Sequence, residues 1–178
     1  MFNWRITKYN PNYRDELGRY KKCEWTSFSE IGTIFNGKKL TIDDYIAIEN
    51  AYVDAIVAFM DDLGIKSLQV KGLEKKNNKF MTDGAHKLYS DEMVNLYISL
   101  QDNDVLDVRE IEYLSRLILR ENLWCKLDQE EILLVHFGYD YYMYIGSRKI
   151  CEDAINNIKD RGLFVEDFVS PYNDEDDN

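Results

Sequence analysis

The segment from Ile42 to Leu63 constrains the fold more than any other part of the chain, because it predicts one long amphipathic helix. Thr41 precedes it as a favourable N-cap, and Gly64 follows it at a position where glycine commonly ends helices. At about 100° per residue, the apolar side chains share one arc of the helix. They are Tyr45, Ile48, Tyr52, Ile56, Phe59, Met60 and Leu63. A helix with so wide an apolar arc requires a large apolar surface to cover it.

The same period predicts which side chains of this helix are buried. We expect Tyr52, Ile56 and Phe59 to lie in the core. The opposite arc, which should face solvent, carries Asp43, Asp54 and Asp61.

The last third of the chain offers a surface for the helix to cover. From about Trp124 the helical period gives way to the alternation that is typical of strands. The expected strands are Trp124–Leu127, Ile132–Phe137, Asp140–Ile145 and Leu163–Phe168, with a tight connection at Gly138-Tyr139. We therefore predict an α+β fold in which an N-terminal helical part, including the long helix, packs on a C-terminal antiparallel sheet.

Several shorter elements complete the prediction. Two strands, Trp4–Tyr9 and Lys66–Leu73, precede the last third, and Asp102–Asp107 is interpreted as a polar loop. Further helices are expected after the N-caps Ser27, Ser90 and Asp107, reaching Phe35, Leu100 and about Glu121, and over Lys149–Lys159. The chain has 178 residues and only 2 prolines, so we expect one domain over residues 1–170 and an acidic, flexible tail over 171–178.

The charge is strongly negative and unevenly distributed. The formal net charge is −11, yet residues 1–40 hold eight Lys and Arg against four Asp and Glu, a net of +4. The remaining residues hold 14 against 29, a net of −15. Such a surface would repel nucleic acids and anionic membranes, so neither is an expected partner. A basic protein would be attracted to it and would associate faster.

The N-terminus and the cysteines favour a cytoplasmic protein. Trp4, Arg5 and Thr7 interrupt the start of the chain before an apolar signal core could form. The three cysteines are far apart and form no CxxC motif, which argues against a disulfide scaffold.

No catalytic, metal or cofactor motif is present. A hydrolytic triad would need a histidine beside a nucleophile and a carboxylate, and only His136, Cys125 and Asp140 offer such a set, without any supporting motif. The other histidine, His86, lies in a polar stretch. The 9 glycines form no phosphate-binding loop. Asp102-Asn103-Asp104 lacks the glycine and glutamate that a calcium loop needs.

Glu49 is the one charged residue near the apolar arc of the long helix. A buried carboxylate is costly unless it is paired, so it could be a general acid or base with a raised pKa. The alternative, which we favour, is an ion pair with Arg109, Arg116 or Arg120 on the helix after Asp107.

Two features indicate a protein-binding surface. Residues 41–65 carry six acidic residues and no Lys or Arg, and Asp61 and Asp62 stand at the end of the helix where the macrodipole disfavours anions. Four tyrosines gather in residues 137–144, and surface tyrosines with acidic neighbours are typical of binding sites. The candidate contact residues are Asp54, Asp61, Asp62, Tyr139, Asp140, Tyr142 and Tyr144.

The segment from Val135 to Gly146, with the sequence VHFGYDYYMYIG, resembles hairpins of small uncharacterised bacterial proteins. In general character the chain also resembles the immunity proteins that neutralise bacterial polymorphic toxins. This resemblance implies a non-enzymatic inhibitor that occludes a basic protein partner such as a toxin. Two alternatives stay open: a small enzyme that uses Glu49, His136 or Asp140, and a structural or regulatory subunit.

Overall fold

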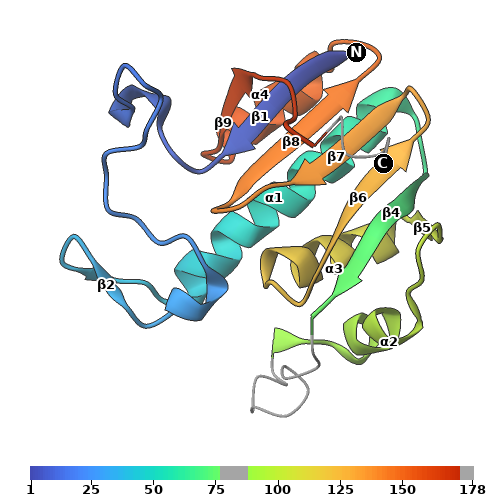
Figure 1. The fold of residues 1–178 in the computed structure, drawn as a ribbon, viewed down its shortest axis with the longest axis horizontal. Helices are drawn as coiled ribbons and strands as arrows, with labels where there is room; N and C mark the ends of the chain where they lie inside the picture. Colours follow the sequence, from blue (N-terminus) through green and yellow to red (C-terminus); the bar gives the residue numbers. More distant parts are fainter. Residues whose placement is uncertain (77–87, 173–178) are drawn as a thin grey trace.

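The computed structural model describes residues 1–76 and 88–172, which form one α+β unit of four helices and a seven-stranded antiparallel sheet (Figure 1). The strands of the sheet are β1 (Phe2–Thr7), β4 (Ser67–Lys75), β5 (Val105–Asp107), β6 (Leu123–Gln129), β7 (Leu133–Phe137), β8 (Tyr142–Ser147) and β9 (Phe164–Asp167). The helices are α1 (Ile42–Leu63), α2 (Asp91–Ser99), α3 (Val108–Leu119) and α4 (Glu152–Asp160).

The strand order is β5-β4-β6-β7-β8-β1-β9, which corrects one part of the predicted architecture. The α+β class is confirmed, but no separate N-terminal helical part exists within the described residues. β1 pairs with both β8 and β9, and β4 pairs with β6, so early and late strands share one sheet. The physical reason is that β1 and β4 satisfy their backbone hydrogen bonds in the ladders of the late strands rather than in a sheet of their own.

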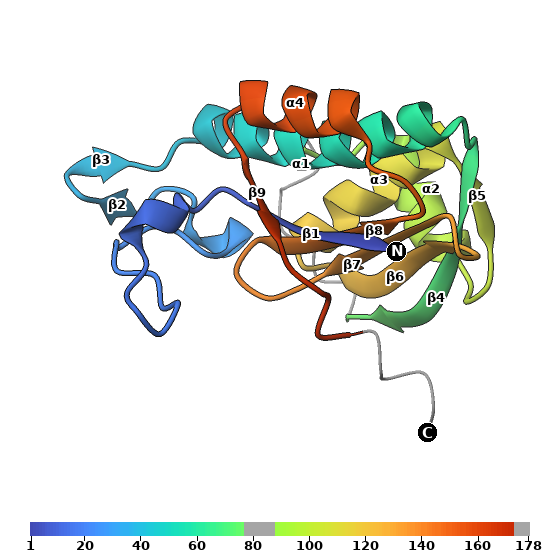
Figure 2. The same cartoon turned by 90° about the horizontal axis from the view of Figure 1, so that it is seen from above.

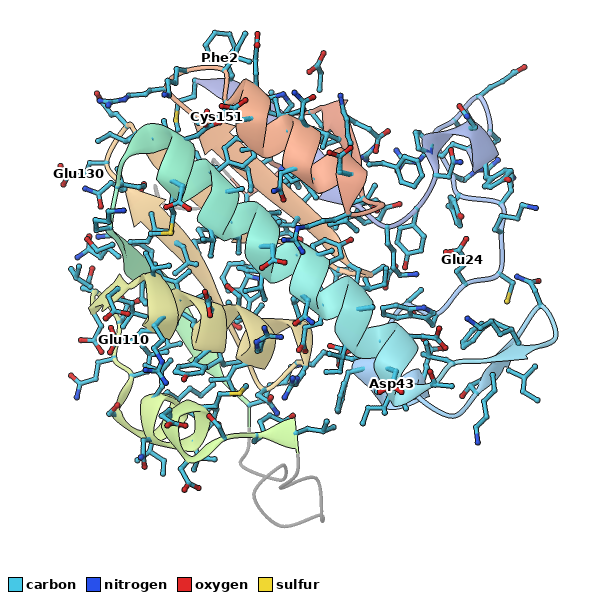
Figure 3. All side chains as sticks on the ribbon, turned by 180° about the vertical axis from the view of Figure 1, so that it is seen from behind. Phe2, Glu24, Asp43, Glu110, Glu130 and Cys151 are labelled. Carbon is cyan, nitrogen blue, oxygen red and sulfur yellow. The ribbon has the colours of Figure 1, made fainter. Side chains whose placement is uncertain are left out.

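The helices cover one face of this sheet, and Figure 2 shows them together above the strands. Seen from the helix side in Figure 3, α1 runs diagonally between α4 and α3. The ring of Trp4 in β1 lies 5.3 Å from that of Phe59 in α1, which identifies the apolar face of the sheet. Because side chains alternate along a strand, Arg5 lies on the opposite, open face.

The long helix has the predicted bounds. Thr41 and Asp44 form a capping box at its start, and Gly64 adopts the left-handed conformation (φ 68°) at its end. Tyr52, Ile56 and Phe59 are fully buried, as predicted. Asp43 and Asp61 are exposed, whereas Asp54 is half-buried beside Arg161. Among residues 1–76 and 88–172, no helix combines the length and apolarity that crossing a membrane requires.

Three local predictions were wrong. The capping box of Ser27 and Glu30 exists, but it starts only one 3-10 turn, η2 (Phe28–Glu30), and the predicted helix does not reach Phe35. Instead β2 (Ile34–Phe35) pairs with β3 (Lys38–Lys39) around a turn with positive φ at Asn36 and Gly37. The predicted loop at 102–107 contains β5, which extends the sheet, and β8 begins at Tyr142 rather than at Asp140.

The segment from Phe168 to Tyr172 crosses the open face of the sheet. Ser170 Oγ lies 2.7 Å from Nδ1 of His136, and Lys126 Nζ donates to the carbonyl oxygen of Tyr172 at 2.9 Å. Tyr172, although it belongs to the predicted tail, therefore lies against β6 and β7. The rest of that tail, residues 173–178, lies outside the described residues, as does His86.

Candidate functional site: an acidic and aromatic groove

The site is organised by the turn between β7 and β8. Asp140 and Tyr141 both have positive φ, 56° and 60°, and the N–H of Tyr142 donates to the carbonyl oxygen of Tyr139 at 3.1 Å. Two central residues of positive φ define a type I′ turn, whose twist matches that of a hairpin. Asparagine and glycine usually occupy these positions, so a tyrosine there is a strained residue that the surrounding structure must hold in place.

Tyr141 is held from both ends. Its carbonyl oxygen accepts from the hydroxyl of Tyr52 at 2.5 Å, and its own hydroxyl donates to the carbonyl oxygen of Leu119 at 2.7 Å. The hydroxyl oxygen of Tyr45 lies 2.9 Å from the hydroxyl oxygen of Tyr141. Burial raises the pKa of Tyr141, so its hydroxyl stays protonated and available as a donor. The turn is thus fixed to α1 and to the end of α3.

A groove of about 570 Å³ opens beside this turn. One wall is the turn itself, from Gly138 to Tyr142. The others are the end of α3, the start of β6, the end of β4 and residues 26–27, which approach from separate parts of the sequence. Its aromatic side chains that are at least partly exposed are Trp124, Tyr139, Tyr142 and Tyr172. Tyr139 projects furthest, with 85% of its surface exposed.

The charge of the groove is negative. Glu74, Glu121 and Asp140 contribute three carboxylates, and Lys76 contributes one ammonium group. Glu121 accepts from the hydroxyl of Ser27 at 2.6 Å and lies 3.9 Å from Lys76 Nζ. Within residues 1–76 and 88–172, Glu74 and Asp140 form no ion pair and accept no side-chain hydrogen bond. An aromatic surface with unpaired carboxylates suits a cationic group, which the rings attract through their faces.

Glu121 also has a positive φ, 61°, directly after α3. Together with Asp140 and Tyr141, it makes three residues of the groove that adopt the left-handed region without being glycine. Such residues cluster at functional sites because they cost free energy and persist only where the structure enforces them. At Glu121 this conformation ends α3, whereas at Tyr141 it is enforced by the hydrogen bonds that hold the turn.

The predicted contact residues are divided between two places. Tyr139, Asp140 and Tyr142 line the groove, but Tyr144 is 8% exposed and packs on the open face against the ring of Phe168. Of the three aspartates of α1 that were predicted to bind, Asp61 and Asp62 lie toward the opposite end of that helix, and none of the three lines the groove. Since a helix rises about 1.5 Å per residue, Asp62 stands roughly 15 Å beyond Tyr52, the residue that contacts the turn.

All three of these aspartates have a partner within the chain. Asp54 pairs at 2.5 Å with Arg161, the C-cap residue of α4. Asp62 accepts from the backbone N–H of Ala154 at 3.1 Å, and Lys149 donates to its carbonyl oxygen. Asp61 is exposed and lies 3.9 Å from Lys66. The acidic side of α1 therefore contributes largely to its junction with α4.

Glu49 forms the predicted ion pair and is completely buried. Its two carboxylate oxygens each accept from Arg120 at 2.7 Å, and one also accepts from Arg116 at 2.9 Å. Arg109, the third candidate, instead donates to the hydroxyl of Tyr113. With both oxygens occupied, Glu49 has a structural role in joining α1 to α3.

The residues of the enzymatic alternative do not meet. Glu49 lies between α1 and α3, Asp140 lies at the turn, and His136 is buried on the open face next to Ser170. The pair of His136 and Ser170 is not in the groove, and the backbone N–H of Tyr172 donates to the same serine oxygen. Cys125, the nucleophile considered with His136, is fully buried, and burial raises the pKa of its thiol to about 12.

No sequence pattern indicates the walls of the groove that lie outside the turn. Trp124, Glu74 and Glu121 were not singled out, because they belong to different elements and only the sheet order brings them together. Within residues 1–76 and 88–172, no group of three or more His, Cys, Asp or Glu side chains is placed to hold a metal ion. Comparisons with protein-family models, with curated proteins and with solved structures find no match to this chain.

Proposed function

We propose that this chain is a non-enzymatic binding protein, and that the groove beside the β7–β8 turn receives a cationic segment of a basic protein. The observation that carries the proposal is the combination of aromatic surface with the carboxylates of Glu74, Glu121 and Asp140. A lysine or arginine side chain would lie against the rings and pair with a carboxylate, and both interactions strengthen when water is displaced.

The resemblance to immunity proteins favours one such function, an inhibitor that binds a toxin. Such a protein occludes its partner and needs no catalytic group of its own. The anchored turn supports this role, because a rigid aromatic contact surface loses little conformational entropy on binding. The contact set of the proposal is Tyr139, Asp140 and Tyr142, extended by Glu74, Glu121 and Trp124.

The first experiment uses two defined probes, a nine-residue arginine peptide and a nine-residue glutamate peptide. We expect isothermal titration calorimetry to detect binding of the arginine peptide alone, with affinity falling as salt screens the charges. The triple variant Glu74→Gln, Glu121→Gln, Asp140→Asn should weaken this binding at least tenfold at low salt.

A matched control removes the same amount of charge elsewhere. The variant Glu16→Gln, Glu130→Gln, Asp160→Asn changes three exposed carboxylates outside the groove, and we expect it to bind within about twofold of the parent. Equal losses in the two triple variants would mean that net charge alone attracts the peptide, and the groove would not be the site. A further double variant, Asp54→Asn with Asp61→Asn, removes two carboxylates of α1. If it alone loses affinity for the arginine peptide, the peptide binds to α1 instead.

A further inference from the structure

The Nε and Nη2 atoms form one edge of an arginine guanidinium group. In Arg120 and Arg5 a carboxylate binds to this edge. Arg120 donates through both atoms to Glu49, each at 2.7 Å. Arg5 donates through both to Glu166, each at 3.2 Å. This side-on arrangement is the bidentate geometry in which a guanidinium group recognises a carboxylate or phosphate.

Arg14 is the third case, and no acceptor in the described part of the chain fills its edge. Its Nη1 donates to Glu166 at 2.8 Å, whereas Nε and Nη2 are buried and have no hydrogen-bond partner among residues 1–76 and 88–172. The side chain is 8% exposed. A buried donor without a partner costs free energy, and for a charged group the cost is greater. The Nε–Nη2 edge of Arg14 therefore holds two donors that no described residue uses.

The surroundings of Arg14 favour an anion as that acceptor. Arg5 and Arg14 share the single carboxylate of Glu166, which leaves one positive charge in excess. The ring of Tyr142 lies 5.7 Å from Cζ of Arg14 and 5.2 Å from Cζ of Arg5, and it adds no charge. In such a partly buried place a charge-assisted hydrogen bond is stronger than at the surface.

We propose that Arg14 is the centre of an oxyanion-binding site, in which its Nε–Nη2 edge receives two oxygens of a small carboxylate or phosphate ligand. Glu166 holds the guanidinium group from its Nη1 end and fixes the direction of the edge, while Arg5 supplies the second positive charge. The site shares Tyr142 with the groove but uses different charged residues and has the opposite charge preference, so it does not depend on the proposed function.

The test follows the side-chain Nε–H resonance of Arg14 in ¹H–¹⁵N spectra of the whole chain. Sodium phosphate and sodium acetate are titrated separately at constant ionic strength, which is maintained with sodium chloride. We expect a saturable shift of the Arg14 resonance with at least one of the two anions. Saturation by phosphate alone assigns a phosphate ligand, and saturation by acetate assigns a carboxylate.

Two variants determine whether the edge itself is responsible. Arg14→Lys keeps the charge but removes the bidentate edge, and it should weaken binding at least tenfold, as measured at the backbone amides of the neighbouring residues. Arg19→Lys is the control, because Arg19 is 67% exposed and pairs with Asp15, and it should bind as the parent does. The absence of a saturable Arg14 shift with either anion would overturn the proposal, even if Arg14→Lys failed to fold. An unchanged affinity in folded Arg14→Lys would do the same.

Discussion

The carboxylate of Asp62, in the last turn of α1, accepts a hydrogen bond from the backbone N–H of Ala154 in the first turn of α4. Alone, α1 would be destabilised by an anion at this end, because its carbonyl groups carry partial negative charge there. The start of α4 has the opposite polarity, and its N-cap residue Cys151 forms no side-chain cap. Asp62 therefore caps a helix to which it does not belong.

Removal of this cap should destabilise the protein. We expect Asp62→Ala to lower the free energy of unfolding by about 1 kcal/mol, the usual cost of losing an N-cap side chain. Asp61→Ala is the control, because that side chain is 65% exposed and should change stability by less than about 0.5 kcal/mol. Urea melts of the two variants measure the difference. Equal effects would show that Asp62 matters only through its charge.

The ion pair of Glu49 with Arg120 supports a second prediction. Glu49→Gln should cost about 3–5 kcal/mol, because it leaves a buried guanidinium group without its counter-charge. The double variant Glu49→Leu, Arg120→Met should recover much of that loss, because both buried charges of the pair are removed together. Arg116 loses its carboxylate partner, but it is partly exposed and still donates to Asn50. Denaturant melts of both variants, with Glu130→Gln as an exposed control, test this. A loss of less than about 1 kcal/mol in Glu49→Gln would contradict the structural role.

The features that could be predicted from the sequence are those that depend on residues close together in the chain. The bounds of α1 depend on residues within one turn of each end, Thr41, Asp44 and Gly64, so local spacing was sufficient. The role of Asp62 depends on Ala154, which is 92 residues away in the sequence. A rule about isolated helices correctly identified Asp62 as unfavourable and could not supply the compensating contact.

The β7–β8 turn also depends on contacts with residues that are distant in the sequence. The alternating pattern of Asp140–Ile145 predicts a strand that begins at Asp140, because tyrosine favours strands. The left-handed conformation of Tyr141 is maintained by Tyr52 and Leu119, two residues from separate helices. The groove depends on this turn and on the pairing of β4 with β6, and neither is encoded in a short motif.

The anchoring of the turn gives the third prediction. Tyr141→Phe should lower the free energy of unfolding by about 0.5–1.5 kcal/mol, because the hydroxyl no longer donates to Leu119. Tyr139→Phe removes the hydroxyl of an exposed neighbour and should be nearly neutral. Thermal melts of both variants provide the comparison. If Tyr141→Phe proved as stable as Tyr139→Phe, the hydroxyl contacts would not hold the turn.

Lys8 supports a prediction about pH. Its ammonium group lies 4.1 Å from the ring centres of both Tyr9 and Trp25, and its Nζ is buried without a hydrogen-bond partner among residues 1–76 and 88–172. Burial lowers the pKa of Lys8 to about 8, and Glu24, 3.5 Å away, opposes this change only in part. An unfolded lysine keeps its proton until about pH 10.4.

The sign of the effect follows from counting protons. Between about pH 8 and pH 10 the unfolded chain holds a proton on Lys8 that the folded chain has lost, so stability gains from this residue as pH rises. Below pH 8 both states hold the proton and the contribution is constant. From pH 7.5 to 9.5 the expected gain is about 1–2 kcal/mol, at roughly 1.4 kcal/mol per unit of pKa difference.

The substitution Lys8→Met isolates this contribution, because methionine fills a similar volume and does not titrate. The phenols and thiols that ionise in the same range are present in both proteins, so their effects cancel when the unfolding free energies are subtracted at each pH. We expect Lys8→Met to be the more stable protein at pH 7.5, and its advantage to shrink by about 1–2 kcal/mol by pH 9.5. Urea melts at half-unit intervals of pH measure this difference. Parallel stability curves would mean that Lys8 keeps an ordinary pKa, and that the two aromatic rings replace the hydration of its charge.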